Sequence, residues 1–270
     1  MKRIKDWIRP ISQFVLLLAI IVLACVFNAA ELLASLIKAV GFQNSELPAW
    51  LRIASAYGRW PLSMAVFVIV WLWIRHKNKE CVLNPDNNIY HDHSYLGYCF
   101  CSYFLGYMQC RLKGVPIPMQ IKLVTNGVFA KFIIDEGIHD APKKDKARVT
   151  NPENYTSVVN LLISDTYKAT KSQLPRTVLQ FSTVEIDRSS DDHMRYNSEE
   201  LVKTVISTIR NLPKTVTELN MFMTTNPTNT YRIAKEALAT ADRDRIKHIY
   251  VFPQEREEPR NFKAKGLKIF

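Results

Sequence analysis

The sequence predicts a membrane α-helical hairpin of two spans, followed by a cytoplasmic α/β domain with a small parallel Rossmann-like sheet and a β-hairpin. Two observations predict this fold class. The first quarter of the 270 residues holds two long apolar runs, and short apolar strands alternate with amphipathic helices from residue 152 onward. We therefore expect a transmembrane region over 1–79, a connecting helix and β-hairpin over 80–151, and a Rossmann-like sensor domain over 152–270.

The first predicted span covers residues 11–30, where Ser12, Gln13 and Asn28 are the only polar side chains. An α-helix rises about 1.5 Å per residue, so a run of this length reaches the roughly 30 Å of a bilayer's hydrocarbon core. A cleaved signal sequence would also begin with basic residues and an apolar run. Phe27, however, stands where a small polar stretch would follow a cleavage site, which favours a span.

The second predicted span covers residues 57–74, where Arg59 would extend to the interface from the start of the helix. Basic residues lie outside both spans. Lys2, Arg3, Lys5 and Arg9 precede the first span, and Arg75, Lys77 and Lys79 follow the second. Because basic flanks stay on the cytoplasmic side, we expect a multi-pass protein of the bacterial inner membrane with cytoplasmic N- and C-termini.

The net charge argues against one class of function. The chain has 36 Lys and Arg against 25 Asp and Glu, a formal charge of +11. Over half of this excess lies in the first 80 residues, beside the two apolar runs, where 10 basic side chains stand against 4 acidic ones. A dedicated nucleic-acid binder instead gathers its basic side chains on its folded domain. The charge therefore does not predict nucleic-acid binding as the main function.

The connecting region leaves a metal site open. His91 and His93 are followed by Cys99 and Cys101, which could hold zinc, but the pairs lack the two-residue spacing of zinc ribbons, and ordinary packing is the alternative. The uncharged segment 94–110 predicts a buried or membrane-surface helix.

A β-hairpin is predicted next. The segments Met119–Val124 and Val128–Ile134 alternate in polarity around Asn126 and Gly127, and Asn-Gly between such segments is typical of a tight hairpin turn. The polar segment 141–151 then predicts a connector.

The region from residue 152 predicts alternating elements, which implies parallel strands joined by right-handed crossovers. Helices are expected where apolar residues recur every three or four positions, and strands where short apolar runs occur. The expected order is helix Ser157–Lys171, strand Arg176–Ser182, helix Asn197–Arg210 capped by Asn197, strand Glu218–Met223, helix Tyr231–Ala241 and strand His248–Phe252.

Two loops that follow predicted strands are candidate ligand loops. Open parallel sheets bind ligands beyond the carboxyl ends of their strands, where helix N-termini offer free N–H groups to phosphates. Helix capping alone is the alternative, because the same residue types are preferred there. The candidate ligand residues are Ser182, Thr183, Thr224, Thr225, Asn226 and Asn229, with Arg188, Arg195 and Arg232 as charge partners.

An acidic segment suggests a different chemistry. Glu185, Asp187, Asp191, Asp192 and His193 could hold a divalent metal for phosphodiester hydrolysis, although an acidic loop is also commonly just solvated. No Walker loop, Gly-x-Gly-x-x-Gly, His-Glu-x-x-His or Gly-x-Ser-x-Gly motif occurs. We therefore expect no cofactor and no standard nucleotide hydrolase, dehydrogenase, zincin or serine hydrolase.

The segments FSTVEID, over residues 181–187, and LNMFMTTNPTNTYRIAKEAL, over 219–238, resemble the ligand-loop regions of CRISPR-associated Rossmann fold (CARF) domains. Asn226 stands where those loops usually carry a glycine. Two spans followed by a small sensor are also similar to membrane effectors of bacterial antiphage systems. The resemblance implies binding of a cyclic oligonucleotide at a dimer interface, and abortive infection by membrane damage.

The sequence thus predicts a non-enzymatic effector. We expect its α/β domain to sense a nucleotide-like anion or a regulatory protein partner, and its assembly into a homo-oligomer to disrupt the lipid bilayer or form a pore. The alternatives are a membrane-tethered metal-dependent nuclease or phosphohydrolase that uses Glu185, Asp187 and His193, and a non-catalytic docking or guard protein.

Overall fold

The structure is a computed structural model that describes residues 7–26, 35–37, 39–40, 49, 60–86, 89–134, 139–142, 146–189, 195–238 and 245–270. It divides the chain into two compact units. The first unit is Met1–Asp86 with Leu96–Gln109, and the second is Asn87–Tyr95 with Cys110–Phe270. The predicted domain boundaries after residues 79 and 151 stay predictions.

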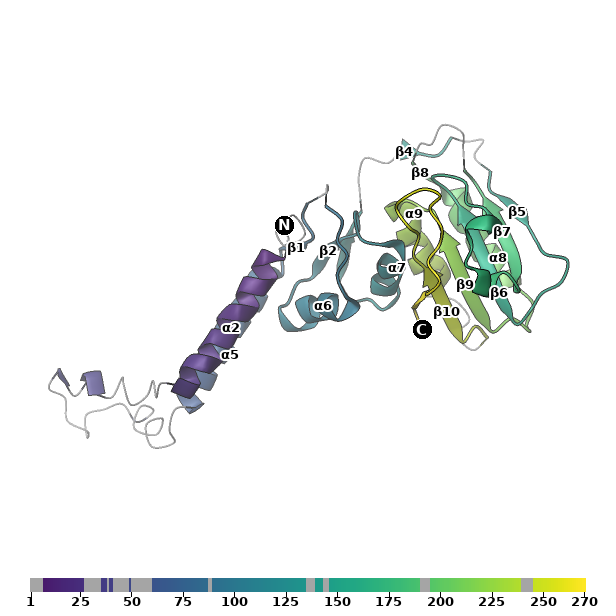
Figure 1. The fold of residues 1–270 in the computed structure, drawn as a ribbon. Helices are drawn as coiled ribbons and strands as arrows, with labels where there is room; N and C mark the ends of the chain where they lie inside the picture. The colour runs from purple at the N-terminus through teal and green to yellow at the C-terminus, as the bar shows by residue number, and fades with distance from the viewer. Residues whose placement is uncertain are drawn as a thin grey trace. The chain divides into compact units, whose positions relative to one another are not determined.

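The first unit is built on two helices that run side by side (Figure 1), α2 (Ile8–Val26) and α5 (Trp60–Asn78). At one end they are joined by a reciprocal amide pair. The Gln13 Nε2 donates to Asn78 Oδ1 and the Asn78 Nδ2 donates to Gln13 Oε1, both at 2.9 Å. Because each amide satisfies the other, this part-buried contact fixes the register of the two helices.

The prediction of two membrane-spanning helices is wrong. Within the described residues, no helix combines the length and the apolar character that crossing a membrane requires. Each apolar run forms a helix, but each helix also includes polar residues at one end. Helix α2 includes Arg9, Ser12 and Gln13, and α5 ends on Arg75–Asn78. Residues 27–30 and 57–59 of the predicted spans lie outside the described residues.

The predicted helix over 94–110 forms in its first part. Helix α6 (Tyr95–Cys99) continues as the π-helix η2 (Phe100–Phe104), which ends before Gly106 at φ +80°, a conformation that favours glycine. The short strands β1 (Val82–Leu83) and β2 (Gln109–Arg111) flank this segment.

The predicted β-hairpin around Asn126 and Gly127 is wrong, because its first arm is a helix. Helix α7 (Ile117–Thr125) carries a proline at its second position, where the missing N–H is not needed, and strand β3 (Lys131–Ile133) follows. Asn126 is the C-cap and Gly127 has φ +58°. The Asn-Gly pair therefore ends a helix in the left-handed conformation instead of turning a hairpin.

The core of the second unit is a mixed sheet, which replaces the small parallel sheet that the sequence predicts. Within the described residues it has six strands in the order β11-β10-β9-β6-β7-β5 (Figure 1). The central strands β10, β9, β6 and β7 are parallel, and β5 and β11 are antiparallel edges. Their bounds are β5 (Arg148–Thr150), β6 (Val158–Ser164), β7 (Ser182–Asp187), β9 (Glu218–Met223), β10 (His248–Phe252) and β11 (Leu267–Lys268).

Helices pack against the sheet and bury its apolar side chains. The larger core includes Val205 of α8 (Glu199–Asn211), Ile233 of the helix formed by α9 (Pro227–Arg232) and the π-helix η5 (Ile233–Leu238), and Ile121 of α7. A smaller core joins Phe222 and Phe252 to the segment with the 3₁₀ helices η3 (Lys171–Gln173) and η4 (Arg176–Val178). A parallel pair, β4 (His139–Asp140) and β8 (Tyr196–Asn197), precedes α8.

The predicted strands at 218–223 and 248–252 are confirmed at both ends. The predicted helix at 197–210 is present, but Ser198 is its cap, since its Oγ accepts the Leu201 N–H at 3.0 Å. The predicted helix at 231–241 begins earlier, at Pro227.

The predicted helix over 157–171 is wrong, because β6 occupies 158–164 as a central strand. A strand covered on both faces is apolar at successive positions, so its pattern cannot be told from that of a buried helix. The predicted strand over 176–182 is also wrong. Its residues form η4 and a turn, and β7 begins at Ser182.

Candidate functional site

The parallel strands of the second unit end together at one edge of the sheet. Ser164 of β6 pairs with Asp187 of β7, and Ile163 pairs with Met223 of β9. The residues that follow these strands therefore share the carboxyl edge, the edge at which open α/β sheets place their ligands.

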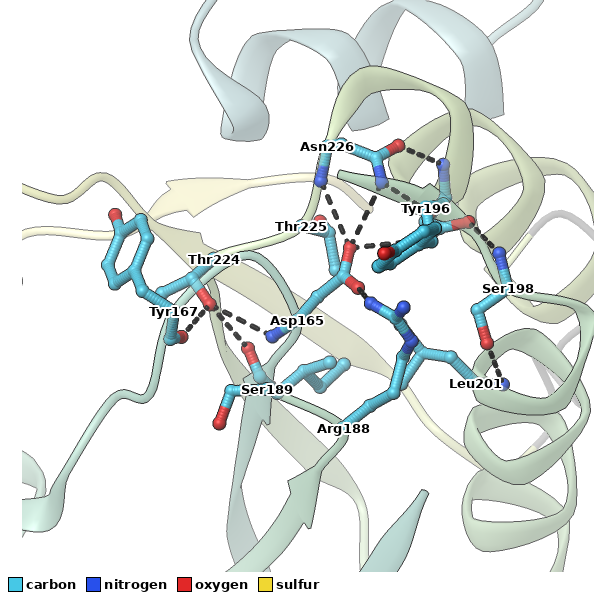
Figure 2. A network of polar contacts seen from close by, with 12 residues as sticks. Asp165, Tyr167, Arg188, Ser189, Tyr196, Ser198, Leu201, Thr224, Thr225 and Asn226 are labelled. Carbon is cyan, nitrogen blue, oxygen red and sulfur yellow. Dashed lines mark hydrogen bonds and ion pairs between the residues drawn. The ribbon is translucent and has the colours of Figure 1, made fainter. Parts of the chain in front are cut away.

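Asp165, directly after β6, is the centre of a buried polar network at this edge (Figure 2). Its Oδ1 pairs with the Arg188 guanidinium at 2.5 Å, and both side chains are at most 1% exposed. Its Oδ2 accepts the backbone N–H of Asn226 at 3.2 Å and the Asn229 Nδ2 at 2.9 Å. The carboxyl group thus ties together the segments that follow three neighbouring strands.

The same asparagines connect the network to the start of α8. Asn226 and Asn229 both donate to the Tyr196 carbonyl, at 2.8 and 2.9 Å, and the Asn229 Oδ1 accepts the Ser198 N–H at 3.0 Å. The Asn226 Oδ1 caps α9 by accepting the Asn229 N–H at 3.0 Å. The Arg188 guanidinium lies over the Tyr196 ring, 5.2 Å from its centroid. These contacts use the polar groups that a ligand would otherwise meet.

Burial raises the pKa of the Asp165 carboxyl above its ordinary value. Desolvation is the largest effect, and the hydrogen bond from Asn229, the charge of Arg188 and the Asn226 N–H oppose it. The network therefore holds a carboxyl whose charged form depends on its partners.

Thr224 and Thr225 are also buried and bonded within the protein. The Thr224 hydroxyl donates to the Tyr167 carbonyl at 2.8 Å and accepts the Asp165 N–H at 3.1 Å. The Thr225 and Thr230 hydroxyls are 2.7 Å apart. With Asn226, Asn229 and Arg188, these predicted ligand residues lie together at the carboxyl edge, and their polar groups are bonded to other groups of the protein.

The structure places the other predicted ligand residues elsewhere. Ser182 and Thr183 begin β7, so they lie at the amino edge. There the Ser182 hydroxyl is 3.0 Å from that of Thr156, and Thr183 receives the Asn160 amide at 3.3 Å. Arg232 pairs with Glu236 at 3.1 Å and lines a separate cavity of about 570 Å³.

An open cleft of about 430 Å³ lies at the carboxyl edge, beside the last residues of β9 and β10. Arg195, predicted as a charge partner, lines it with Arg256 and Arg260. Tyrosine rings complete the polar part of its wall. The Arg256 guanidinium lies 3.3 Å from the Tyr90 centroid, and that of Arg260 lies 4.9 Å from the Tyr167 centroid. The remaining lining residues are Val115, Pro116, Ile117, Pro118, Met223, Phe252, Pro253, Gln254 and Glu255.

These groups suit an anion that carries an aromatic ring. Guanidinium groups bind phosphates through paired N–H donors, and tyrosine rings and guanidinium planes both stack on nucleobases. Three arginines line the cleft against one acidic residue, Glu255, and Arg260 is paired with Glu258 at 2.9 Å. The positive charges still outnumber the negative ones, so the cleft is electropositive.

The sequence alone missed several of these residues. Asp165 and Tyr167 fell inside a segment predicted to be helical, and Tyr90, Arg256 and Arg260 lie far from the predicted loops. An arginine pair in a polar segment after the last parallel strand was the available signal for Arg256 and Arg260.

The described acidic residues do not gather around a metal position. Glu185 pairs with Lys171 at 2.9 Å and Asp187 with Lys168 at 3.8 Å. Asp191, Asp192 and His193 lie outside the described residues. Among the described residues, which include His91, His93, Cys99 and Cys101, no group of three or more His, Cys, Asp or Glu side chains could hold a metal ion.

A family model matches the chain over residues 1–270. It is described as the SMODS- and Ubiquitin system-associated 2TM effector domain. That description implies a membrane protein that acts as an effector in antiphage defence, and it confirms the resemblance to such effectors. No curated protein matches the chain.

Solved structures give distant matches. The receptor Cap4 of Acinetobacter baumannii, described as containing a SAVED/CARF domain, matches in its complex with the cyclic trinucleotide 2′3′3′-cAAA at 8% identity and a TM-score of 0.46. The match covers 64% of this chain and 42% of that chain. Its complex with 3′3′3′-cAAA matches at 8% identity and a TM-score of 0.43, over 64% and 41%. The chain thus spans about two fifths of these receptors, and a likeness of this size carries no functional argument.

Proposed function

Because the chain belongs to the family of SMODS- and ubiquitin system-associated 2TM effector domains, we propose that it is a defence effector whose second unit binds a nucleotide-like anion. The cleft at the carboxyl edge is the proposed binding site. Binding would favour one assembly of the chain through its higher affinity for that assembly, and the assembled first units would then disrupt the membrane.

The electropositive cleft is the observation that carries the ligand class. Arg195 and Arg256 are exposed side chains of its lining, and Arg260 is half-buried, so their donors can reach an incoming phosphate. The network around Asp165 would hold the floor of this site in place, since Thr224 bonds to both Asp165 and Tyr167. We therefore assign phosphate binding to the arginines and a supporting role to the buried asparagines.

Exposed apolar side chains support action at a membrane. Along α2 and α5, Val22 is 59% exposed and Ile69 is 66% exposed, and Trp60 and Trp73 are each 57% exposed. A soluble surface rarely carries so continuous an apolar face, which needs lipid or other copies of the chain to cover it. We propose that the protein acts at the bacterial inner membrane, that both of its termini are cytoplasmic, and that it forms a homo-oligomer when it acts. A two-span topology is not part of the proposal.

We propose that the chain is not an enzyme. Glu185 and Asp187 are the described members of the acidic set, and their carboxylates pair with Lys171 and Lys168. These ion pairs give the acidic residues a structural role without a metal ion. A regulatory protein partner that docks on the second unit remains compatible with the proposal.

Membrane potential in phage-challenged cells tests the proposal. Cells that express the full chain should depolarise on infection, and cells that express the Arg195→Ala/Arg260→Ala variant should not, because the cleft has lost two phosphate-binding groups. Arg210→Ala, which removes an exposed arginine of α8 outside the cleft lining, is the matched control and should behave as the wild type. Depolarisation that the cleft variant leaves unchanged would contradict the proposal, as would no depolarisation by the wild type.

A further inference from the structure

One face of the Tyr90 ring is covered by the side chain of Arg256, which is exposed to solvent. The Arg256 guanidinium carbon is 3.3 Å from the ring centroid, the separation of two planar groups in stacking contact. Arg256 is exposed and Tyr90 is half-buried, and both line the cleft. The stacking position is therefore already built, and its present occupant is a solvent-accessible side chain.

The backbone on both sides of Tyr90 is held in place. The His91 N–H donates to the Gly114 carbonyl at 2.8 Å, and the His91 side chain is fully buried. On the other side, the Ile89 carbonyl approaches so closely that a Cβ on Gly114 would lie 2.3 Å from its oxygen. Gly114 has φ +80°, so a glycine is needed there for both its backbone conformation and its lack of a side chain. The Tyr90 ring is thus presented to the cleft from a fixed backbone.

The segment that carries Arg256 is ordered on its own side of the cleft. The Glu255 N–H donates to the Asn261 carbonyl and the Lys263 N–H to the Pro253 carbonyl, both at 2.8 Å. These bonds join backbone groups of the loop after β10, and none of them involves the exposed Arg256 side chain. Moving the guanidinium off the ring therefore requires no change in the loop.

We propose that Tyr90 is the base-stacking residue of the cleft, and that a nucleobase takes the place of the Arg256 guanidinium on its ring. This inference rests on the proposed function and narrows the ligand to anions that carry a planar base, as opposed to phosphate or polyphosphate alone. The displaced guanidinium then lies free to pair with a phosphate of the same ligand.

The position of Tyr90 in the chain gives this contact a second consequence. Tyr90 belongs to the segment Asn87–Tyr95 of the second unit, and the chain enters the first unit on both sides of that segment. A base stacked on Tyr90 therefore contacts a segment that is covalently joined to the first unit at each end.

Calorimetric titration of the full chain tests the inference. The probes are ATP, cyclic di- and trinucleotides of adenosine and guanosine including 2′3′3′-cAAA, and inorganic tripolyphosphate, which has the charge but no base. We expect Tyr90→Leu to lower the affinity for the nucleotide that binds by about 5- to 150-fold, the range that loss of one base stack gives, and to leave tripolyphosphate binding unchanged. Tyr90→Phe, which keeps the ring, should bind as the wild type.

Two controls separate stacking from other effects. Arg260→Ala should weaken both classes of probe, because it removes charge. Tyr103→Ala, which truncates a tyrosine of the first unit that is 61% exposed, should change neither. Nucleotide binding that survives Tyr90→Leu, or an equal loss of nucleotide and tripolyphosphate, would overturn the role of Tyr90 while the proposed function stands. A wild type that binds no nucleotide of the panel would overturn both.

Discussion

Replacement of Arg188 by methionine should destabilise the second unit, and the size of the loss should depend on pH. Arg188 and Asp165 are at most 1% exposed and 2.5 Å apart, so the substitution leaves a buried carboxyl without its cation. Removing one partner of a buried ion pair typically costs about 3–5 kcal/mol. The backbone N–H of Arg188 donates to the Ser164 carbonyl, and the substitution leaves that bond in place.

The sign of the pH dependence follows from the Asp165 carboxyl. Burial already raises its pKa in the wild type, and loss of the Arg188 charge removes an effect that lowers it. Between the ordinary pKa of 3.8 and the raised one, the folded state binds more protons than the unfolded state, so the free energy of unfolding falls as pH rises through this window. The variant should therefore lose more stability at pH 8 than at pH 5.

Hydrogen exchange of peptides from β6 and β9 is the suitable assay. All tryptophans of the chain lie between residues 7 and 73, so tryptophan fluorescence does not report on the second unit. Lys168→Met is the matched control, since Lys168 is 69% exposed and its pair with Asp187 at 3.8 Å should contribute about 0–1 kcal/mol. Asp165→Asn added to Arg188→Met should recover part of the loss at pH 8 and remove its pH dependence. A loss below about 1 kcal/mol, or one that is equal at pH 5 and pH 8, would refute the reasoning.

Further predictions concern positions outside this ion pair. Gly114→Ala should raise hydrogen exchange in residues 89–95, because its Cβ would meet the Ile89 oxygen at 2.3 Å; unchanged exchange there would show that the segment does not depend on Gly114. Asn160→Ala should lower the free energy of unfolding by about 1–3 kcal/mol, measured by denaturant titration of strand protection, because the buried Val178 carbonyl and the Asn220 amide lose their partner. Glu199→Gln should leave the free energy of unfolding unchanged within the error of the denaturant titration, since its pair with Lys203 is fully exposed to solvent, and a measurable loss would contradict that account.

The sequence predicted some elements of the second unit well. Strands β9 and β10 are short apolar runs bounded by polar residues, and α8 has a clear apolar face, so each pattern has one interpretation. Strand β6 was missed because neighbours cover it on both sides, and its apolar residues therefore follow one another without alternation. The Asn126–Gly127 pair misled in a similar way, since a left-handed glycine serves a hairpin turn and a helix end equally.

The site shows what local patterns cannot reach. The rule that ligands gather beyond strand ends placed Thr224, Asn226 and Arg188 at the carboxyl edge, where the structure has them. The start of β7 at Ser182 turned a predicted loop into a strand, and this moved Ser182 to the opposite edge. Asp165 could not be found before β6 was known, because its role depends on three segments that meet only in the folded sheet.

The most direct test of the account is hydrogen exchange of the full chain with and without the nucleotide that binds most tightly in the titration panel. Binding in the cleft predicts increased protection in residues 89–95, 112–118 and 253–262, which carry its wall, and no change in β5 at the far edge of the sheet. Protection that appears at the amino edge around Ser182, with none in these three segments, would contradict the assignment of the cleft as the ligand site.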